Sequence, residues 1–195
     1  MDLKQEGGKI ILINGASSAG KSTLAQALWE KLDEPFLYYS FDHFRAAEVL
    51  PMERIRDKEL DWLAMRPAFF EGFHRSLAAF ASAGNNLLVE HIVETEAWMD
   101  RLLDLLAPFE VFFIGVHCPL AELERREAER GDRRIGEARA DYTAVHNHCQ
   151  YDLELDSTEP ADRLANLALL AWRNRLVPSA FERMAYRRGT ANGNS

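Results

Sequence analysis

Short apolar runs alternate with longer amphipathic stretches along this 195-residue chain. Five of the runs are apolar on both faces and rich in β-branched or aromatic residues, which is typical of buried strands in a parallel sheet. Between them, apolar residues recur at helical spacing and predict helices. We expect strands at 9–14, 35–41, 86–93, 110–118 and 151–156. We expect helices from Gly20 onward and at 67–83, 95–107, 119–130, 137–148 and 160–176.

Strands that alternate with helices indicate βαβ units, and therefore an α/β fold with helices on both faces of a parallel sheet. No repeat or linker interrupts residues 8–176, so we expect one domain there, of a size that suits a single core. Residues 177–195 form a C-terminal extension. Its first part, 177–189, predicts a short amphipathic helix, and its small, polar last residues predict disorder.

Composition narrows the classes of protein. The net charge of −8 argues against a large nucleic-acid footprint. The polar N-terminus "MDLKQEGGK" does not have the pattern of a signal peptide, and no apolar run approaches the length of a membrane span. The two cysteines, Cys118 and Cys149, are expected to be reduced thiols. We therefore expect a cytoplasmic protein that does not enter a membrane; the oligomeric state is not readable from the sequence.

The stretch "GASSAGKS" at 15–22 matches GxxxxGK[ST] and lies between an expected buried strand and a helix start. In this pattern the glycines let backbone N–H groups point at phosphate, and the helix N-terminus adds partial positive charge. Lys21 would reach the β- and γ-phosphates, and Ser22 would ligate Mg²⁺. The nucleotide-binding residues that we predict here are Gly15, Ala16, Ser17, Ser18, Ala19, Gly20, Lys21, Ser22 and Thr23.

Glu90 stands late in the apolar strand "LLVEHIV", where a second Mg²⁺ ligand is expected. Two interpretations carry similar weight: a residue that holds the ion or its water, and an acid exposed at a strand end. His91 should face away from Glu90 in a regular strand and is expected to be structural. His146 and His148, two apart on an expected helix, do not share a face and make a poor zinc site, so structural or surface roles are favoured.

Asp42 follows the second strand, "PFLYYSF". If the first two strands are parallel, Asp42 lies at the same sheet edge as the phosphate loop, across a cleft from Lys21. There a carboxylate could accept the proton of a hydroxyl that attacks phosphate. It could equally be the N-cap of a helix at 43–50, or lie in a solvated turn, and capping is compatible with catalysis.

The stretch "ERREAERGDRRIGE" at 124–137 contains five arginines. A solvated helix end is the default reading of such a run. Phosphoryl transfer, however, uses cations around the transferred oxygens, and Gly131 would let a short lid close. Arg126, Arg130 and Arg133 are the candidates, with Arg134 behind them.

Four blocks of the sequence resemble the chloramphenicol phosphotransferase-like family of P-loop kinases. They are "IILINGASSAGKS" (10–22), "EPFLYYSFD" (34–42), "RPAFFEGFHRSLAAFASAGNNLLVEHIV" (66–93) and "GVHCPLAELERREAERGDRRIGEARADYTAVHNHCQYDLELDST" (115–158). Together they cover most of residues 9–158. The last block is the most specific, because its R-G-D-R step, its Val145–His146 pair and its "YDLELDST" ending recur in that order.

The resemblance implies a three-layer α/β/α P-loop kinase fold with an adenylate-kinase-like sheet, strand order 2-3-1-4-5, and a short lid. It also implies ATP as phosphoryl donor and Mg²⁺ as metal. The proposed base of the family maps onto Asp42. The loop lysine and serine map onto Lys21 and Ser22, and the arginines around the R-G-D-R step map onto Arg130 and Arg133. Arg126 is a further candidate for the nucleotide.

The chain departs from the chloramphenicol enzyme after Asp42, in the segment "HFRAAEVLPMERIRDKELDWLAM", and at Glu90–His91, where two acids are expected. We therefore expect transfer of the γ-phosphate of ATP to a hydroxyl of a small molecule, with chloramphenicol as one candidate. Alternatives are another acceptor (a nucleoside, an amino sugar or a nucleic-acid end) and a non-catalytic nucleotide-binding switch. Residues that could line the acceptor pocket are His43, Phe44, Arg45, Phe70 and Glu94.

Overall fold

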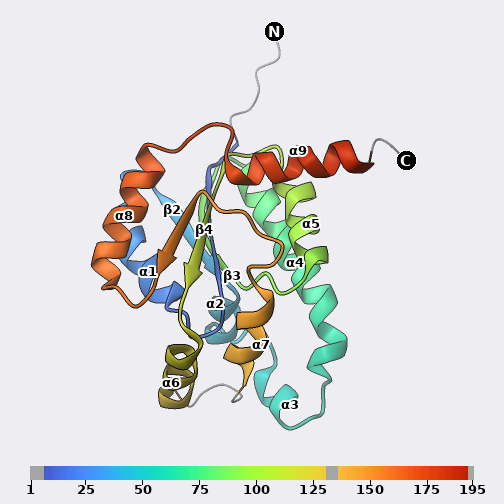
Figure 1. Ribbon diagram of the computed structural model, residues 1–195. Coiled ribbons are helices and arrows are strands. Elements are labelled where there is room, and N and C mark those ends of the chain that lie inside the picture. Colours follow the sequence, from blue (N-terminus) through green and yellow to red (C-terminus); the bar gives the residue numbers. More distant parts are fainter. Residues whose placement is uncertain (1–6, 131–135, 193–195) are drawn as a thin grey trace.

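A computed structural model describes residues 7–130 and 136–192 of the chain (Figure 1). Five parallel strands form one sheet in the order β2-β3-β1-β4-β5, which confirms the predicted strand order. All five expected strands are present, with ends that move by one to two residues. The strands are β1 (Ile10–Gly15), β2 (Phe36–Ser40), β3 (Asn86–His91), β4 (Val111–His117) and β5 (Leu153–Asp156).

Helices precede and follow these strands in the described residues. They are α1 (Lys21–Trp29), α2 (Phe41–Ala46), α3 (Met52–Arg56), α4 (Trp62–Ser82), α5 (Glu96–Leu106), α6 (Leu120–Arg130), α7 (Glu137–Ala144), α8 (Ala161–Arg173) and α9 (Ala180–Asn192). No helix within the described residues is long and apolar enough to cross a membrane. The predicted lid around Gly131 lies outside the described residues.

The three central strands, β1, β3 and β4, are buried on both faces, and their side chains alternate between two cores. In β1, Ile11 and Ile13 face a core that α1 and α8 complete, whereas Ile10 and Leu12 face a core made with α4, α5 and α9. Figure 1 shows these two helical layers on opposite sides of the sheet. The fold is thus the predicted three-layer α/β/α arrangement.

Two helix starts differ from the sequence prediction. Helix α4 begins at Trp62 rather than at Pro67, because the Asp61 side chain accepts a hydrogen bond from the N–H of Leu63 at 2.9 Å and caps the helix. The proline then lies inside the helix near its start. The helix expected at 43–50 is α2, which begins at Phe41, and α3 follows it as a separate short helix that the apolar pattern did not indicate.

C-terminal helix α9 packs against β4. Phe181 is 1% exposed and lies edge-on to Phe113 at 6.0 Å between ring centroids, within the same core that α4 and α5 cover. Tyr186, in contrast, is 74% exposed on the outer side of the helix. Residues of the C-terminal extension therefore contribute to the core that Ile10 and Leu12 of β1 face.

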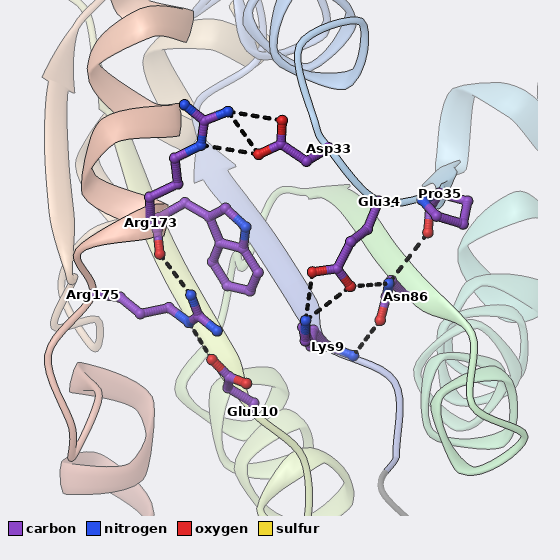
Figure 2. A network of polar contacts seen from close by, with 9 residues as sticks. Lys9, Asp33, Glu34, Pro35, Asn86, Glu110, Arg173 and Arg175 are labelled. Atoms are coloured by element: carbon purple, nitrogen blue, oxygen red, sulfur yellow. Dashed lines mark hydrogen bonds and ion pairs between the residues drawn. The ribbon is translucent and has the colours of Figure 1, made fainter.

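Polar contacts fasten the edge of the sheet where the strands begin (Figure 2). The Lys9 ammonium donates to the Glu34 carboxylate at 2.6 Å, and the Lys9 N–H donates to the Asn86 side chain at 2.9 Å. Nearby, Arg173 at the end of α8 pairs with Asp33 at 2.6 Å. These contacts join the segments that precede β1 and β2 to the first residue of β3 and to the end of α8. The polar side chains at this edge therefore have structural roles. The candidate functional site lies at the opposite edge, where the strands end.

Candidate active site

The phosphate loop is the turn between β1 and α1. Gly20, which caps α1, has φ of 86°, a left-handed conformation that glycine adopts at little cost. Gly15 ends β1 so close to β4 that a Cβ there would lie 2.5 Å from the carbonyl oxygen of Val116. These two glycines fix the turn that directs the first turn of α1 back over the end of β1. The predicted loop is therefore a tight strand–turn–helix connection, the context that the phosphate-loop pattern needs.

The loop presents polar groups at this turn. Lys21 is 8% exposed, and its Nζ donates to the carbonyl of Ala16 at 2.7 Å, so the ammonium lies over the loop itself. Ser18 has φ of 63°, and its hydroxyl oxygen is buried with no hydrogen-bond partner among the described residues. Buried hydroxyls are almost always bonded, so this one fits a ligand with acceptor oxygens. Ala16 and Ala19 are buried members of the loop, and Thr23 is exposed beside Ser22.

Glu90 of β3 lies beside the loop serine. Its Oε2 accepts a hydrogen bond from the Ser22 hydroxyl at 2.8 Å, and its Oε1 accepts one from the Tyr38 hydroxyl. Glu90 is 7% exposed, so it is not the solvated strand-end acid of the alternative interpretation. A hydroxyl and a carboxylate are oxygen ligands of the kind that Mg²⁺ prefers, and Mg²⁺ commonly takes one or two protein ligands besides water and phosphate oxygens. The pair thus fits the expected metal.

Asp42 lies at the same edge of the sheet, in the first turn of α2. It is not the N-cap: that position belongs to Ser40, whose hydroxyl accepts from the N–H of His43 at 3.3 Å. Asp42 instead forms an ion pair with Arg45 at 3.3 Å, and 40% of its side chain is exposed. The pKa of Tyr38 is raised chiefly by burial, then by Glu90 and then by the negative charge of Asp42. The Asp42 carboxylate is therefore close enough to affect the Tyr38 hydroxyl electrostatically.

Of the predicted arginines, Arg126 reaches the loop. Its guanidinium donates to the carbonyl of Ser157 at 2.9 Å, and a Cβ on Gly20 would lie 3.4 Å from its Nη1. Arg126 therefore joins the segment after β5 to the start of α1. The side chain of Arg130 and the whole of Arg133 lie outside the described residues, as does Arg134.

Asp141 of α7 is a site residue that the sequence did not indicate. Its Oδ2 accepts a hydrogen bond from the Ser17 N–H of the loop at 2.8 Å. Burial is the main cause that raises the pKa of Asp141; Glu94 raises it too, whereas the Ser17 N–H and Lys21 oppose the shift. Asp141 is one of two acids in the helix expected at 137–148, and no local pattern distinguishes it from Glu137.

Helix α7 is held in this position by two buried polar side chains. The carboxylate of Glu127, 3% exposed, accepts from the N–H groups of Gly136 and Ala138 at 2.8 Å each, where α7 begins. At its other end, Asn14 of β1 donates to the carbonyl of Val145 at 2.8 Å. The contact between Asp141 and the phosphate loop is thus supported at both ends of the helix.

The five candidate acceptor residues occupy three places. His43 lies edge-on to Tyr38, with 4.6 Å between the rings, next to the Asp42–Arg45 pair. Phe44 and Phe70 belong to the aromatic core between α2 and α4, so they are chiefly packing residues. Glu94, just after β3, forms an ion pair with Arg66.

The histidines lie in structural or surface positions, but α7 ends at Ala144, so His146 and His148 follow the helix and do not lie on it as expected. His91 faces away from Glu90 and contacts His74, with 2.8 Å between the two Nε2 atoms. His146 contacts the Tyr151 hydroxyl at 2.7 Å and stacks on His117. His148 lies near Glu96 at 3.9 Å. Within residues 7–130 and 136–192, no three His, Cys, Asp or Glu side chains come together as metal ligands.

Comparison with known sequences identifies relatives over nearly the whole chain. The family described as chloramphenicol phosphotransferase-like protein matches residues 8–173. A relative in two strains of Mycobacterium tuberculosis, which carries the name "Putative O-phosphotransferase", is 33% identical over 200 residues. The match covers 92% of this chain and 89% of that protein.

Solved kinases share the fold. The APS kinase of Mycobacterium tuberculosis, in complex with AMPPNP and APS, has a TM-score of 0.64 at 19% identity, over 86% of this chain and 99% of that chain. A sugar kinase from Janibacter has 0.61 at 18%, over 85% and 95%. Shikimate kinase from Aquifex aeolicus has 0.53 at 16%, over 87% and 99%. Sequence and fold together establish that the chain belongs to the chloramphenicol phosphotransferase-like family of P-loop kinases.

Proposed function

We propose that this protein transfers the γ-phosphate of ATP to a hydroxyl group of a small molecule in the cytoplasm. One observation carries the proposal: the phosphate loop, the Ser22–Glu90 pair and Asp42 all lie where parallel strands end, at one edge of the sheet. Ligands of open α/β sheets bind at this edge. Both cysteines are free thiols, which suits a reducing compartment.

Each residue has a chemical role in this proposal. Lys21 would leave the Ala16 carbonyl to bind the β- and γ-phosphate oxygens, and Arg126 would hold the nucleotide beside Gly20. Mg²⁺ held at Ser22 and Glu90 would neutralise negative charge on the β- and γ-phosphates. Arg130 and Arg133, which the family resemblance implicates, would contact the transferred group.

Asp42 would act as the general base. Arg45 orients its carboxylate, and its partial exposure leaves it accessible to an incoming hydroxyl. As the acceptor oxygen forms its bond to the γ-phosphorus, the bond from that phosphorus to the β–γ bridging oxygen breaks. Asp42 takes the hydroxyl proton, and ADP leaves with the electron pair of the broken bond.

The acceptor is open within the class of hydroxyl-bearing small molecules. Chloramphenicol is one candidate, suggested by the family. A nucleoside or an amino sugar is another. The residues after Asp42, which differ from the chloramphenicol enzyme, would determine the choice. A screen of phosphoryl transfer from ATP against hydroxyl-bearing antibiotics and metabolites would identify the acceptor.

Two variants test the mechanism once an acceptor is found. Asp42→Asn should lower the rate of transfer by about 10²- to 10⁴-fold, the usual contribution of a general base, and leave AMPPNP binding intact. Lys21→Ala should abolish nucleotide binding. Asp104→Asn, an exposed acid in the last turn of α5 and outside the segment that follows Asp42, is the matched control and should transfer at the wild-type rate. Unchanged transfer by Asp42→Asn would exclude Asp42 as the base.

A further inference from the structure

Tyr38 of β2 holds the carboxylate that we assign to the metal. Glu90 has two oxygens, and each has a different donor: the Ser22 hydroxyl from α1 on one, and the Tyr38 hydroxyl from β2 on the other. Two consecutive elements, α1 and β2, therefore meet the distant strand β3 at one carboxylate. Neither the phosphate-loop pattern nor the strand pattern accounts for the tyrosine.

Strand register explains why this tyrosine, and not its neighbour, reaches Glu90. Ser40 pairs directly with Glu90, and Tyr38 precedes Ser40 by two positions, so Tyr38 and Glu90 lie on the same face of the sheet. Tyr39 points to the other face, where its hydroxyl lies 2.7 Å from the Ser76 hydroxyl. The two tyrosines are thus chemically identical and oppositely placed.

Packing orients the Tyr38 ring. It lies edge-on to His43 with centroids 4.6 Å apart and is tilted against Trp29 at 6.1 Å. The phenol hydroxyl is the donor in its contact with Glu90, because a carboxylate offers only acceptor oxygens. The donor is therefore fixed in position by the packing of its ring.

We propose that Tyr38 is a positioning residue for Mg²⁺. Its hydroxyl holds one oxygen of the long Glu90 side chain, so that the other oxygen stays beside Ser22. Glutamate has one more rotatable bond than aspartate, so a carboxylate at this position needs an additional restraint to present one oxygen to a metal. Groups that hydrogen-bond to a metal-ligating carboxylate commonly tune metal affinity. The inference rests on the proposed function, because it requires that the Ser22–Glu90 pair binds the metal of a nucleotide complex.

The test uses Tyr38→Phe, which removes only the hydroxyl. Mn²⁺, which favours the same oxygen ligands as Mg²⁺, would report metal binding through its electron paramagnetic resonance signal in the presence of AMPPNP. We expect the affinity of the protein–AMPPNP complex for Mn²⁺ to fall by about 10- to 100-fold. Affinity for AMPPNP without metal, and the melting temperature relative to Tyr39→Phe, should change little. A purely structural role would not alter the metal affinity selectively.

Two controls make the result decisive. Tyr39→Phe removes the same hydroxyl from the opposite face and should bind Mn²⁺ as the wild type does. In a Glu90→Gln background, Tyr38→Phe should add little further loss, because the tyrosine acts through the carboxylate. If Tyr38→Phe and Tyr39→Phe bind Mn²⁺ equally, or if the losses from Tyr38→Phe and Glu90→Gln multiply, the inference is wrong. Failure of the wild type to bind AMPPNP would instead overturn the proposed function, and the inference with it.

Discussion

The His74–His91 pair should make the stability of the protein depend on pH. Both side chains are buried, with 1% and 4% of their surface exposed, and their Nε2 atoms are 2.8 Å apart. Burial is the main cause that lowers the pKa of His74 to about 4, and it also lowers the pKa of His91 well below the ordinary value. An imidazolium here would lose its hydration, and two would repel each other. Both rings are therefore neutral in the folded protein at neutral pH.

The size of the effect follows from the difference between the folded and unfolded pKa values. An unfolded histidine titrates near pH 6.5, so between pH 6.5 and 4 the unfolded chain binds a proton at His74 that the folded chain does not. This contribution to stability is complete above pH 6.5 and decreases as the pH falls. From pH 7.5 to 5.0, His74 alone should lower the free energy of unfolding by about 2 kcal/mol, and His91 acts in the same direction.

Urea unfolding monitored by tryptophan fluorescence at pH 7.5 and 5.0 would measure this loss. His74→Gln keeps a hydrogen-bonding side chain but does not titrate, so its loss of stability between the two pH values should be smaller than that of the wild type by about 2 kcal/mol. His148→Gln, in which an exposed histidine is replaced, should behave as the wild type does. A pH-dependent loss as large in His74→Gln as in the wild type would refute the reasoning.

Two further predictions concern α7 and α9. Asp141→Asn keeps an acceptor for the Ser17 N–H but removes a negative charge beside the phosphate loop, so AMPPNP should bind more tightly by about 3- to 30-fold in a calorimetric titration. Glu137→Gln, at the exposed start of α7, should change the affinity for AMPPNP less. Unchanged or weaker binding by Asp141→Asn would contradict the electrostatic argument. Phe181→Ala should lower the free energy of unfolding by about 3–5 kcal/mol because the ring is fully packed in the core. Tyr186→Ala, on the exposed side of α9, should lower the free energy of unfolding far less. Equal losses of stability in the two variants would mean that α9 is not part of the core.

Local sequence patterns were enough to predict the structure where all the residues that determine it are contiguous. The strand, the turn and the helix start around Gly15–Ser22 are contiguous, and Gly20 adopts the left-handed conformation that such a turn needs. The strands were predictable because a short continuous apolar run is typical of a strand that is covered on both faces. The alternation of strands and helices predicted the layers, whereas the strand order came from resemblance to the family.

Local signals failed where two chemically similar residues compete. Ser40 and Asp42 are both good helix caps, and only the path of the chain after β2 shows that Ser40 takes the cap and Asp42 lies in the first turn. Similarly, the spacing of apolar residues predicted a helix that begins at residue 67, but Asp61 accepts from the N–H of Leu63 and α4 begins at Trp62. Such choices depend on side-chain hydrogen bonds that differ by little in free energy.

By itself, the sequence determined a nucleotide-type phosphate loop in an α/β fold, because the residues that make the loop are adjacent and their geometry is local. Only the tertiary structure brought Tyr38 to Glu90 and Asp141 to Ser17. These contacts join residues 52 and 124 positions apart. They depend on strand register and on how α7 is held against β1, and no short-range pattern of hydrophobic and polar residues encodes either one.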